Sequence, residues 1–345
     1  MDQKYTEFAV QKTVELLGID SPTGYTVAAE QFVLEEFKKL GYTVKHTQKG
    51  GVVVDLGGKD AQNALLLEAH MDTLGGMVAE IKSNGRLRIV NVGGLNANNV
   101  EAENCRIVTK FNGSYEGTFQ LVNASVHVNA DYSTIVRKFD NMEVVLDEVV
   151  KSDNEVKALG ISVGDFICFD PRTKVTEKGY IKSRFLDDKL SVGILLSFAK
   201  YLKEEGITPE RRVYIHITVY EEVGHGGSAS VPEGVTEAIA VDMGCVGEGL
   251  QCTERQVSIC AKDSSGPFSY EVVKKLIAAA QKEQADFAVD IYPFYSSDVK
   301  TTLAAGNDIR HGLIGAGVYA SHGYERSHKD GVTNTLKVLK GYLEV

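Results

Sequence analysis

The chain lacks a long hydrophobic run. Its wholly apolar stretches are short, as in the strand-like residues 64–67, whereas a membrane-spanning helix needs about 20 apolar residues. The N-terminus, MDQKYTEFAVQK, has no basic segment followed by an apolar one, so no secretory signal is recognisable. These absences predict no membrane association and a cytoplasmic location.

Positive charge and cysteine are also scarce. The 37 basic residues are outnumbered by 47 acidic ones, and the net charge is −10. An acidic chain without a basic cluster is a poor partner for nucleic acid or for an anionic membrane surface. The five cysteines form no CxxC pair and are odd in number, which indicates reduced thiols in a cytosolic protein.

The remaining composition is typical of a folded globular protein. Hydrophobic residues make up 43% of the chain and charged residues 24%, values that exclude a disordered, collagen-like or low-complexity chain. The 345 residues are enough for two domains of ordinary size, at roughly 100–200 residues each.

The order of helical and strand-like segments predicts an α/β domain with an insertion. Helical periodicity is present at residues 5–17 and 27–40, and Gly41 follows the second segment as a helix stop. Residues 51–56 and 64–69 follow as strands. The second strand is apolar through its first half, which is typical of a strand buried on both faces of a parallel sheet.

Between residues 73 and 171 the pattern changes to short strand-like pieces separated by Gly, Asn and Asp. Strands are expected at residues 77–81, 87–90, 106–111, 118–122, 125–128 and 165–169, with a charged helix at residues 142–159. From residue 184 the α/β pattern returns, with helices at residues 186–202, 270–286 and 332–343 and strands at residues 213–219, 238–241 and 313–320. We therefore expect residues 1–72 and 172–345 to form one α/β domain, into which residues 73–171 are inserted as a β-rich domain.

Histidines and carboxylates recur where the predicted strands end or the helices begin. In an open α/β sheet, the carboxyl ends of the strands border the ligand crevice. Several unpaired carboxylates at one edge would repel one another and raise each other's pKa, and a divalent cation such as zinc, cobalt or manganese would remove that cost. The candidates are His70 and Asp72 in EAHMD, Asp187 and Asp188 in FLDDK, Glu221 and Glu222 in VYEEVG, Asp242 in AVDMG, and His322 in YASHGYERSH.

Each of these segments also has an ordinary structural explanation. A His-x-Asp sequence at a strand end is common without a metal, and an Asp pair at a helix start often caps the helix and complements its dipole. The Glu pair fits a solvated loop, and Asp242 fits a turn. This explanation has to apply four times, always at a strand or helix end, which favours a shared site.

Other catalytic motifs are absent or incomplete. Residues 315–320 match the dinucleotide-binding pattern GxGxxA, but only 345 − 320 = 25 residues follow, too few for another βαβ unit with its acidic ribose-binding residue. No HExxH, P-loop or GxSxG sequence occurs. His225 follows the Glu pair closely enough to line the site. The histidines without partner spacing, which we assign to the surface or the core, are His46, His127, His216 and His311.

These motifs, in this order, make the chain resemble the glutamyl/deblocking aminopeptidase family of co-catalytic metallopeptidases, which includes the tetrahedral aminopeptidases and some members described as endoglucanases. The resemblance covers nearly the whole chain and rests on AHMDTLGGMVAEI, LGISVGDFICF, SRFLDDKLSVG, YEEVGHGG and VDMG. It implies a zinc-peptidase-like mixed sheet flanked by helices, with an inserted small β-barrel-like domain that serves oligomerisation and access. It also implies a large homo-oligomer such as a dodecamer.

The resemblance further implies a site for two divalent metal ions, with zinc the foremost candidate. His70 and Asp242 would bind one ion, Glu222 and a C-terminal histidine would bind the other, and Asp187 would bridge both. The family commonly has Arg or Asn after the bridging aspartate, where this chain has Asp188 and Lys189.

The same resemblance implies that Glu221 is the general base for a water shared by the metals and that Asp72 holds the His70 ring in the ligating tautomer. The substrates would be peptides with a free N-terminus. Two alternatives remain: a carboxypeptidase or deacylase-type dinuclear amide hydrolase, and a non-catalytic scaffold member. The presence of both Glu221 and Asp187 argues against the scaffold, and the surrounding histidines argue against a glycosidase that uses two carboxylates without metal.

The C-terminal ligand has two candidates. The family commonly ends the last ligand strand with Arg-Tyr-x-His-Ser, where this chain has Val-Tyr-Ala-Ser-His at residues 318–322. His322 lies at the carboxyl edge of the predicted strand, and His328 lies at the approach to the final helix. We expect His322 to be the ligand, and His328, with Glu325 and Arg326, to line the pocket or support it.

Overall fold

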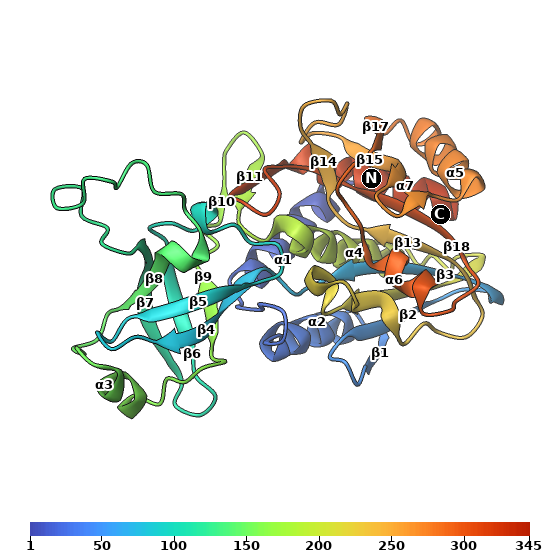
Figure 1. Cartoon of the computed structure of the whole chain (residues 1–345). Coiled ribbons are helices and arrows are strands. Elements are labelled where there is room, and N and C mark those ends of the chain that lie inside the picture. Colours follow the sequence, from blue (N-terminus) through green and yellow to red (C-terminus); the bar gives the residue numbers. More distant parts are fainter. The chain divides into compact units, whose positions relative to one another are not determined.

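The computed structural model describes residues 1–345. The chain divides into two compact units, Met1–Asp72 with Arg172–Val345, and Thr73–Pro171, both visible in Figure 1. No helix is both long and apolar enough to span a bilayer.

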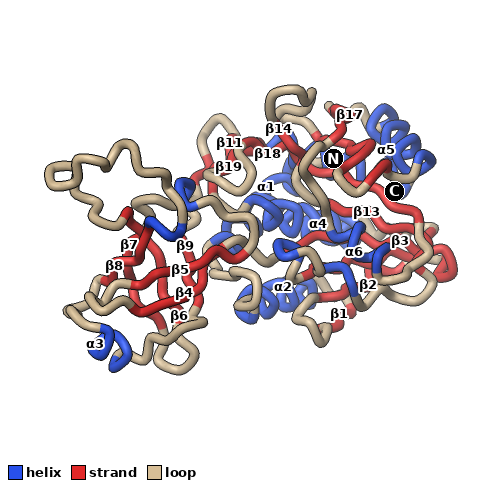
Figure 2. Tube along the Cα trace, in the orientation of Figure 1, coloured by secondary structure: helices blue, strands red, loops and turns tan.

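The first unit is a mixed sheet covered by helices (Figure 2). Nine of its thirteen strands are hydrogen-bonded in the order β1-β2-β12-β3-β13-β18-β19-β11-β10. Of the other four, β14 and β15 pair with β18, and β16 and β17 pair with β15. The helices are α1 (Gln3–Leu17), α2 (Val27–Lys39), α4 (Leu186–Glu204), α5 (Tyr270–Lys282), α6 (Asp298–Ala304) and α7 (Lys329–Leu343). The strands are β1 (Thr43–His46), β2 (Val52–Gly57), β3 (Asp60–His70), β10 (Lys174–Val175), β11 (Tyr180–Ser183), β12 (Arg211–Thr218), β13 (Val235–Val241), β14 (Gly244–Val246), β15 (Val257–Asp263), β16 (Gly266–Pro267), β17 (Phe287–Ile291), β18 (Arg310–Tyr319) and β19 (Glu325–His328).

The central strands of this sheet are parallel. Strand β3 pairs in parallel with β12 on one side and β13 on the other, and β13 pairs in parallel with β18. Because both faces of β3 are covered, its residues from Ala64 onward are all buried. The carboxyl ends of β3, β12, β13 and β18 therefore lie at the same edge of the sheet.

Apolar side chains alternate between two cores along β3. Leu65 and Leu67 join the large core, which also contains residues of α1, α2, α4, α5 and α7. Leu66 joins a smaller core on the other face, together with Val299 of α6. This alternation follows from the two-residue repeat of a strand, and it gives the sheet a helical layer on each face.

The N-terminal helices begin and end within two residues of their predicted bounds. Helix α2 starts at Val27 and ends at Lys39. Gly41 takes a positive φ of 82°, and Tyr42 donates its backbone N–H to the Phe37 carbonyl at 3.2 Å. This is the 6→1 bond of a glycine-terminated helix.

The second unit is a closed barrel in the strand order β4-β5-β8-β7-β6-β9. Its interior is apolar, and the rings of Phe119 and Phe169 meet edge to face with their centroids 5.7 Å apart. The predicted fold class, a mixed α/β sheet with an inserted small barrel, is confirmed. The strands are β4 (Gly75–Ile81), β5 (Leu87–Val92), β6 (Asn104–Val108), β7 (Ser114–Leu121), β8 (Met142–Leu146) and β9 (Phe166–Phe169), and the one α-helix is α3 (Asp153–Ala158).

Two predicted elements of the barrel unit are wrong. The charged helix expected at residues 142–159 is a strand followed by the short helix α3, because Ser152 and Glu155 form a capping box that starts the helix late. The strand expected at residues 125–128 is a turn, in which Val128 donates its N–H to the Ser125 carbonyl. No neighbouring strand covers this segment, and the side chain of Val128 is 73% exposed.

Candidate metal centre

The candidate residues reach one edge of the sheet because the strands that precede them are parallel. His70 ends β3 and lies opposite Thr218, the last residue of β12. The short helix η3 (Glu221–Val223) follows β12 after two residues. Asp242 follows the end of β13, and His322 lies three residues beyond the end of β18.

Asp187 comes from the first turn of α4, although it does not cap that helix. Asp187 and Asp188 both have non-helical backbone angles, and no side chain caps the helix start. The Asp187 carboxylate instead lies between two histidines, with Oδ1 at 3.1 Å from His70 Nε2 and Oδ2 at 3.5 Å from His322 Nε2.

The two glutamates of η3 complete this arrangement from the other side. Glu222 Oε2 lies 3.6 Å from His322 Nε2, and Glu221 Oε2 lies 3.7 Å from His70 Nε2. Ligand atoms of His70, Asp187 and Glu222 all lie within 4.8 Å of one another. Glu222 is thus close to both the shared aspartate and the C-terminal histidine.

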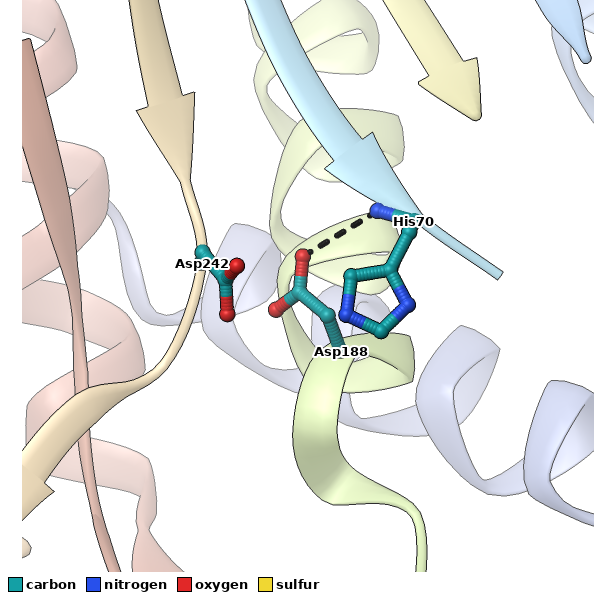
Figure 3. Close-up of side chains that lie close together, drawn as sticks. All are labelled: His70, Asp188 and Asp242. Carbon is teal, nitrogen blue, oxygen red and sulfur yellow. Dashed lines mark hydrogen bonds between the residues drawn. The ribbon is translucent and has the colours of Figure 1, made fainter. Parts of the chain in front are cut away.

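A second group shares His70. The side chains of His70, Asp188 and Asp242 converge from the end of β3, the start of α4 and the end of β13 (Figure 3), with ligand atoms again within 4.8 Å of one another. Asp188 Oδ2 accepts the His70 backbone N–H at 3.3 Å, and its other oxygen is buried without a hydrogen-bond partner. Asp242 Oδ1 accepts the Met243 N–H at 2.5 Å.

Burial and mutual repulsion shift the pKa values of these carboxyl groups. Burial, followed by repulsion from Asp187, raises the pKa of Asp242 to about 7 and raises the pKa of Glu222 well above its usual range. Burial also raises the pKa of Glu221. For Asp187, burial acts in the same direction, but His322 and His70 outweigh it and lower the pKa. Such crowding of acids is costly unless a cation lies among them.

The donor set fits divalent ions in both identity and spacing. Nitrogen and carboxylate ligands at about 2.0–2.1 Å from zinc in a tetrahedron stand roughly 3.3 Å apart from one another. The distances that join Asp187 and Glu222 to the histidine Nε2 atoms are between 3.1 and 3.6 Å. The side chains are therefore spaced as ligands of shared ions would be.

Asp72 supports the site through both its main chain and its side chain. His70 Nδ1 lies 2.9 Å from the Asp72 carbonyl and 3.6 Å from its Oδ1, so the nearer partner of the ring is the backbone. The carboxylate accepts the backbone N–H groups of Glu221 and Glu222 at 3.2 and 3.4 Å and the Thr23 hydroxyl at 2.6 Å. Asp72 thus holds the glutamate segment as well as the His70 ring.

Glu325 supports the opposite side. It is 1% exposed, and its carboxylate accepts the backbone N–H of Asp187 at 3.1 Å and that of His322 at 2.9 Å. The residue therefore ties the start of α4 to the segment that carries His322. From the sequence, Glu325 is expected either to line the pocket or to support it.

The other two histidines considered for the site, His225 and His328, make their contacts outside the carboxylate cluster. His328 accepts the Asp330 N–H at the start of α7, and its Nε2 lies 2.8 Å from the Lys178 carbonyl. His225 is exposed, and its ring stacks on Tyr220. Neither has a contact with the carboxylates of the cluster.

The chain matches the M42 glutamyl aminopeptidase family over residues 50–338. It belongs to this family. The candidate aminopeptidase YhfE of Bacillus subtilis (strain 168) is 42% identical over 340 residues, which cover 97% of this chain and 98% of YhfE. The M42 assignment confirms the predicted resemblance and makes the protein an aminopeptidase, a metal-dependent hydrolase of peptide bonds.

Two solved structures of aminopeptidases share the fold of this M42 member. The aminopeptidase APDkam598 from the archaeon Desulfurococcus kamchatkensis superposes with a TM-score of 0.87 at 21% identity, covering 99% of this chain and 95% of its own. The Pyrococcus horikoshii TET1 peptidase, which can assemble into a tetrahedron or a large octahedral shell, superposes with a TM-score of 0.84 at 22% identity, covering 96% and 98%.

Proposed function

We propose that this M42 peptidase removes N-terminal residues from peptides with two divalent ions, for which zinc is the ion best suited to the donors. The observation that carries the proposal is the placement of Asp187, whose two carboxylate oxygens face His70 and His322 separately. One carboxylate between two histidines is the arrangement expected of a bridging ligand.

The remaining ligands divide between these two histidines. Asp242 lies in a group with His70 and Asp188, and Glu222, which also lies near His70 and Asp187, has its Oε2 3.6 Å from His322 Nε2. His322 is the C-terminal ligand in this assignment, because its Nε2 faces Asp187 and Glu222. The imidazole of His328 instead bonds the Asp330 N–H and lies against the Lys178 carbonyl.

Glu221 is the general base of the proposed reaction. Bound divalent ions would polarise the scissile carbonyl and acidify a water molecule. The Glu221 side chain is 14% exposed, its carboxylate lies close to His70, and it is not among the ligands assigned above. A base in this position takes the proton from the water and returns it to the leaving amine.

The donors of the site favour substrates with a free N-terminus. The carboxylates of Asp187, Glu222 and Asp242 would offset most of the charge of two divalent ions, one of which could hold the free α-amino group of a peptide. This preference supports an aminopeptidase over a carboxypeptidase or an N-deacylase.

The barrel unit serves assembly and access in this proposal. It supplies none of the assigned ligands, and it exposes several apolar side chains, including Phe111, Val126, Val128 and Val149. Val122, Val126, Val128 and Val136 are exposed within one short segment of the barrel unit, and neighbouring exposed apolar groups are typical of a surface that another copy covers. We therefore propose a homo-oligomer, such as the dodecamer seen for PhTET1.

Chelation tests the function directly. The wild-type protein should hydrolyse aminoacyl anilides and lose this activity on exhaustive treatment with a chelator. Zinc, cobalt or manganese should restore it, with about two ions bound per chain. Full activity in metal-free protein would contradict the proposal, and hydrolysis of only N-acylated or C-terminal substrates would favour the deacylase or carboxypeptidase alternative.

A further inference from the structure

The segment that carries Glu221 and Glu222 is a loop with two defined ends. It leaves the sheet at Thr218, the last residue of β12, and closes at Gly227 in the short helix η4 (Gly226–Ser228). Asp72 binds the middle of this loop through the Glu221 and Glu222 amides. What holds the two ends together lies on a different element.

One carboxylate binds both ends of the loop. Asp298, the first residue of α6, is 3% exposed. Its Oδ1 accepts the Gly227 backbone N–H at 2.5 Å, and its Oδ2 accepts the hydroxyl of Thr218. These partners lie 71 and 80 residues away in sequence, so the contact is entirely tertiary.

Helix α6 packs closely on the same backbone. The Thr302 hydroxyl lies 3.0 Å from the Gly227 carbonyl and 2.9 Å from the buried carboxylate of Glu68. A Cβ at Gly227 would stand 2.3 Å from Thr302 Oγ1 and 2.7 Å from the Asp298 carbonyl. Only glycine permits this approach, which keeps the closing end of the loop directly against α6.

We propose that Asp298 is a positioning residue that closes the base of loop 219–226 and thereby holds Glu221 and Glu222 in place against His70 and Asp187. The inference rests on the proposed function for its catalytic consequence. Its structural part, the closure of the loop, stands on the two hydrogen bonds alone. A displacement of about 1 Å at reacting groups can reduce the rate by about 10²-fold, so a carboxylate that never touches substrate can affect turnover strongly.

The conservative variant should preserve this closure. In Asp298→Asn, the amide oxygen can still accept the Gly227 N–H, and the amide nitrogen can donate to the Thr218 hydroxyl. That hydroxyl can in turn donate to the Ala69 carbonyl, which lies 3.4 Å away. In Asp298→Ala both ends lose the carboxylate that joins them, and only the separate contacts of Gly227 with Thr302 and of Thr218 with Ala69 are left.

The test compares three variants with wild type: Asp298→Ala, Asp298→Asn and the control Thr301→Ala. Thr301 lies on the same helix, and its hydroxyl bonds only the Asp298 carbonyl. Hydrogen exchange of the amides of residues 219–227 is measured in metal-free protein, and kcat and KM are measured for an aminoacyl anilide in the metal-loaded enzyme. We expect Asp298→Ala to raise exchange at least tenfold in this segment only, and to lower kcat at least tenfold with KM within about threefold.

The variants separate positioning from a general loss of stability. Asp298→Asn should keep both exchange and kcat within about threefold of wild type, as should Thr301→Ala. The proposal is overturned if Asp298→Ala leaves exchange and kcat within twofold of wild type, or if exchange rises equally throughout the unit. If Asp298→Ala fails to fold, the same exchange and kinetic measurements are made on Thr218→Val, which removes only the hydrogen bond between Thr218 and Asp298. If the wild type shows no peptidase activity, the proposed function fails, while the exchange result still decides whether Asp298 closes the loop.

Discussion

At the scale of single residues, the site depends on carboxylates that face in defined directions. Asp187 presents one oxygen to each of two histidines, whereas the next residue, Asp188, turns an oxygen to the His70 backbone. Glu221 and Glu222 are also adjacent, yet they lie near different histidines. Neighbouring acids of the same type therefore have different proposed tasks, which makes paired substitutions informative.

Substituting each of the two glutamates by glutamine distinguishes the proposed base from the proposed metal ligand. Glu221→Gln should lower kcat by about 10²–10⁴-fold, the usual contribution of a general base, while the chain still binds about two metal ions. Glu222→Gln should instead reduce the metal content towards one ion. Metal analysis and anilide kinetics on both variants check this assignment. Near wild-type turnover in Glu221→Gln would show that another group accepts the proton.

Substitutions of the two C-terminal histidines, His322 and His328, give a second informative pair of variants. His322→Ala should lose one metal ion, because its Nε2 faces Asp187 and Glu222. His328→Ala should keep both ions and lose about 1 kcal/mol of stability, because it removes the cap that accepts the Asp330 N–H of α7. Counting bound metal and measuring urea unfolding distinguish the two effects. Loss of metal from His328→Ala with both ions kept in His322→Ala would reverse the assignment.

At the scale of elements, buried charged side chains lie at both ends of the central strands. The carboxyl ends of β3, β12 and β13 are followed by the candidate ligands, and the amino ends of β12, β13 and β18 meet around Glu237. This residue is 4% exposed and accepts hydrogen bonds from Arg211 at 2.6 Å and the Tyr342 hydroxyl at 2.7 Å. Arg310 lies 3.3 Å from its other oxygen. Glu237 thus ties three strands to helix α7.

The Glu237 contacts predict an acid-dependent stability. Burial acts to raise its pKa, but the Tyr342 and Arg211 hydrogen bonds outweigh burial and lower it. The stability that the ionised group contributes is therefore present above the unfolded pKa of about 4.3 and is lost as the pH falls below it.

Glu237→Gln should accordingly reduce the free energy of unfolding by about 1–3 kcal/mol at neutral pH, and the difference from wild type should shrink below about pH 4. Urea unfolding across this range measures it. Glu271→Gln, an exposed neighbour on α5, is the matched control and should change little. An effect of Glu237→Gln that does not vary with pH would contradict the electrostatic explanation.

At the scale of the whole molecule, the two units differ in what they contribute. The sheet unit contains every residue assigned to the metal site, and the barrel unit exposes the side chains of Val122, Val126, Val128 and Val136. The proposed division of labour is chemistry in one unit and assembly in the other.

This division predicts the effect of surface charge on assembly. Light scattering should show a large homo-oligomer for the wild type at micromolar concentration. Val128→Asp should dissociate it or reduce its size, because a charge in a covered apolar contact is costly. Phe294→Asp, at a side chain of the sheet unit that is 97% exposed, should leave it intact. A strictly monomeric wild type would contradict the proposed assembly.

Much of the fold could be predicted because its signals are local. The 3.6-residue repeat placed α1, α2, α4, α5 and α7, and the apolar run of β3 predicted a strand covered on both faces. The predictions failed at residues 142–159, where apolar and charged residues are mixed without a clear period, and at residues 125–128, whose two-residue alternation is typical of a strand but which form a turn. There the neighbouring strands of the barrel decide which residues pair, and a linear pattern carries no information about those neighbours.

The same distinction applies to the site. Residue type and position at strand ends were sufficient to name the acids and histidines of the cluster, because parallel strands bring their carboxyl ends to one edge. Which oxygen faces which histidine depended on the turn before α4. That Asp72 binds the glutamate amides, and that Asp298 closes the glutamate loop from 71 to 80 residues away, appeared only in three dimensions. Periodicity and side-chain chemistry can be identified from the sequence alone, whereas hydrogen bonds between distant segments exist only once packing has brought those segments together.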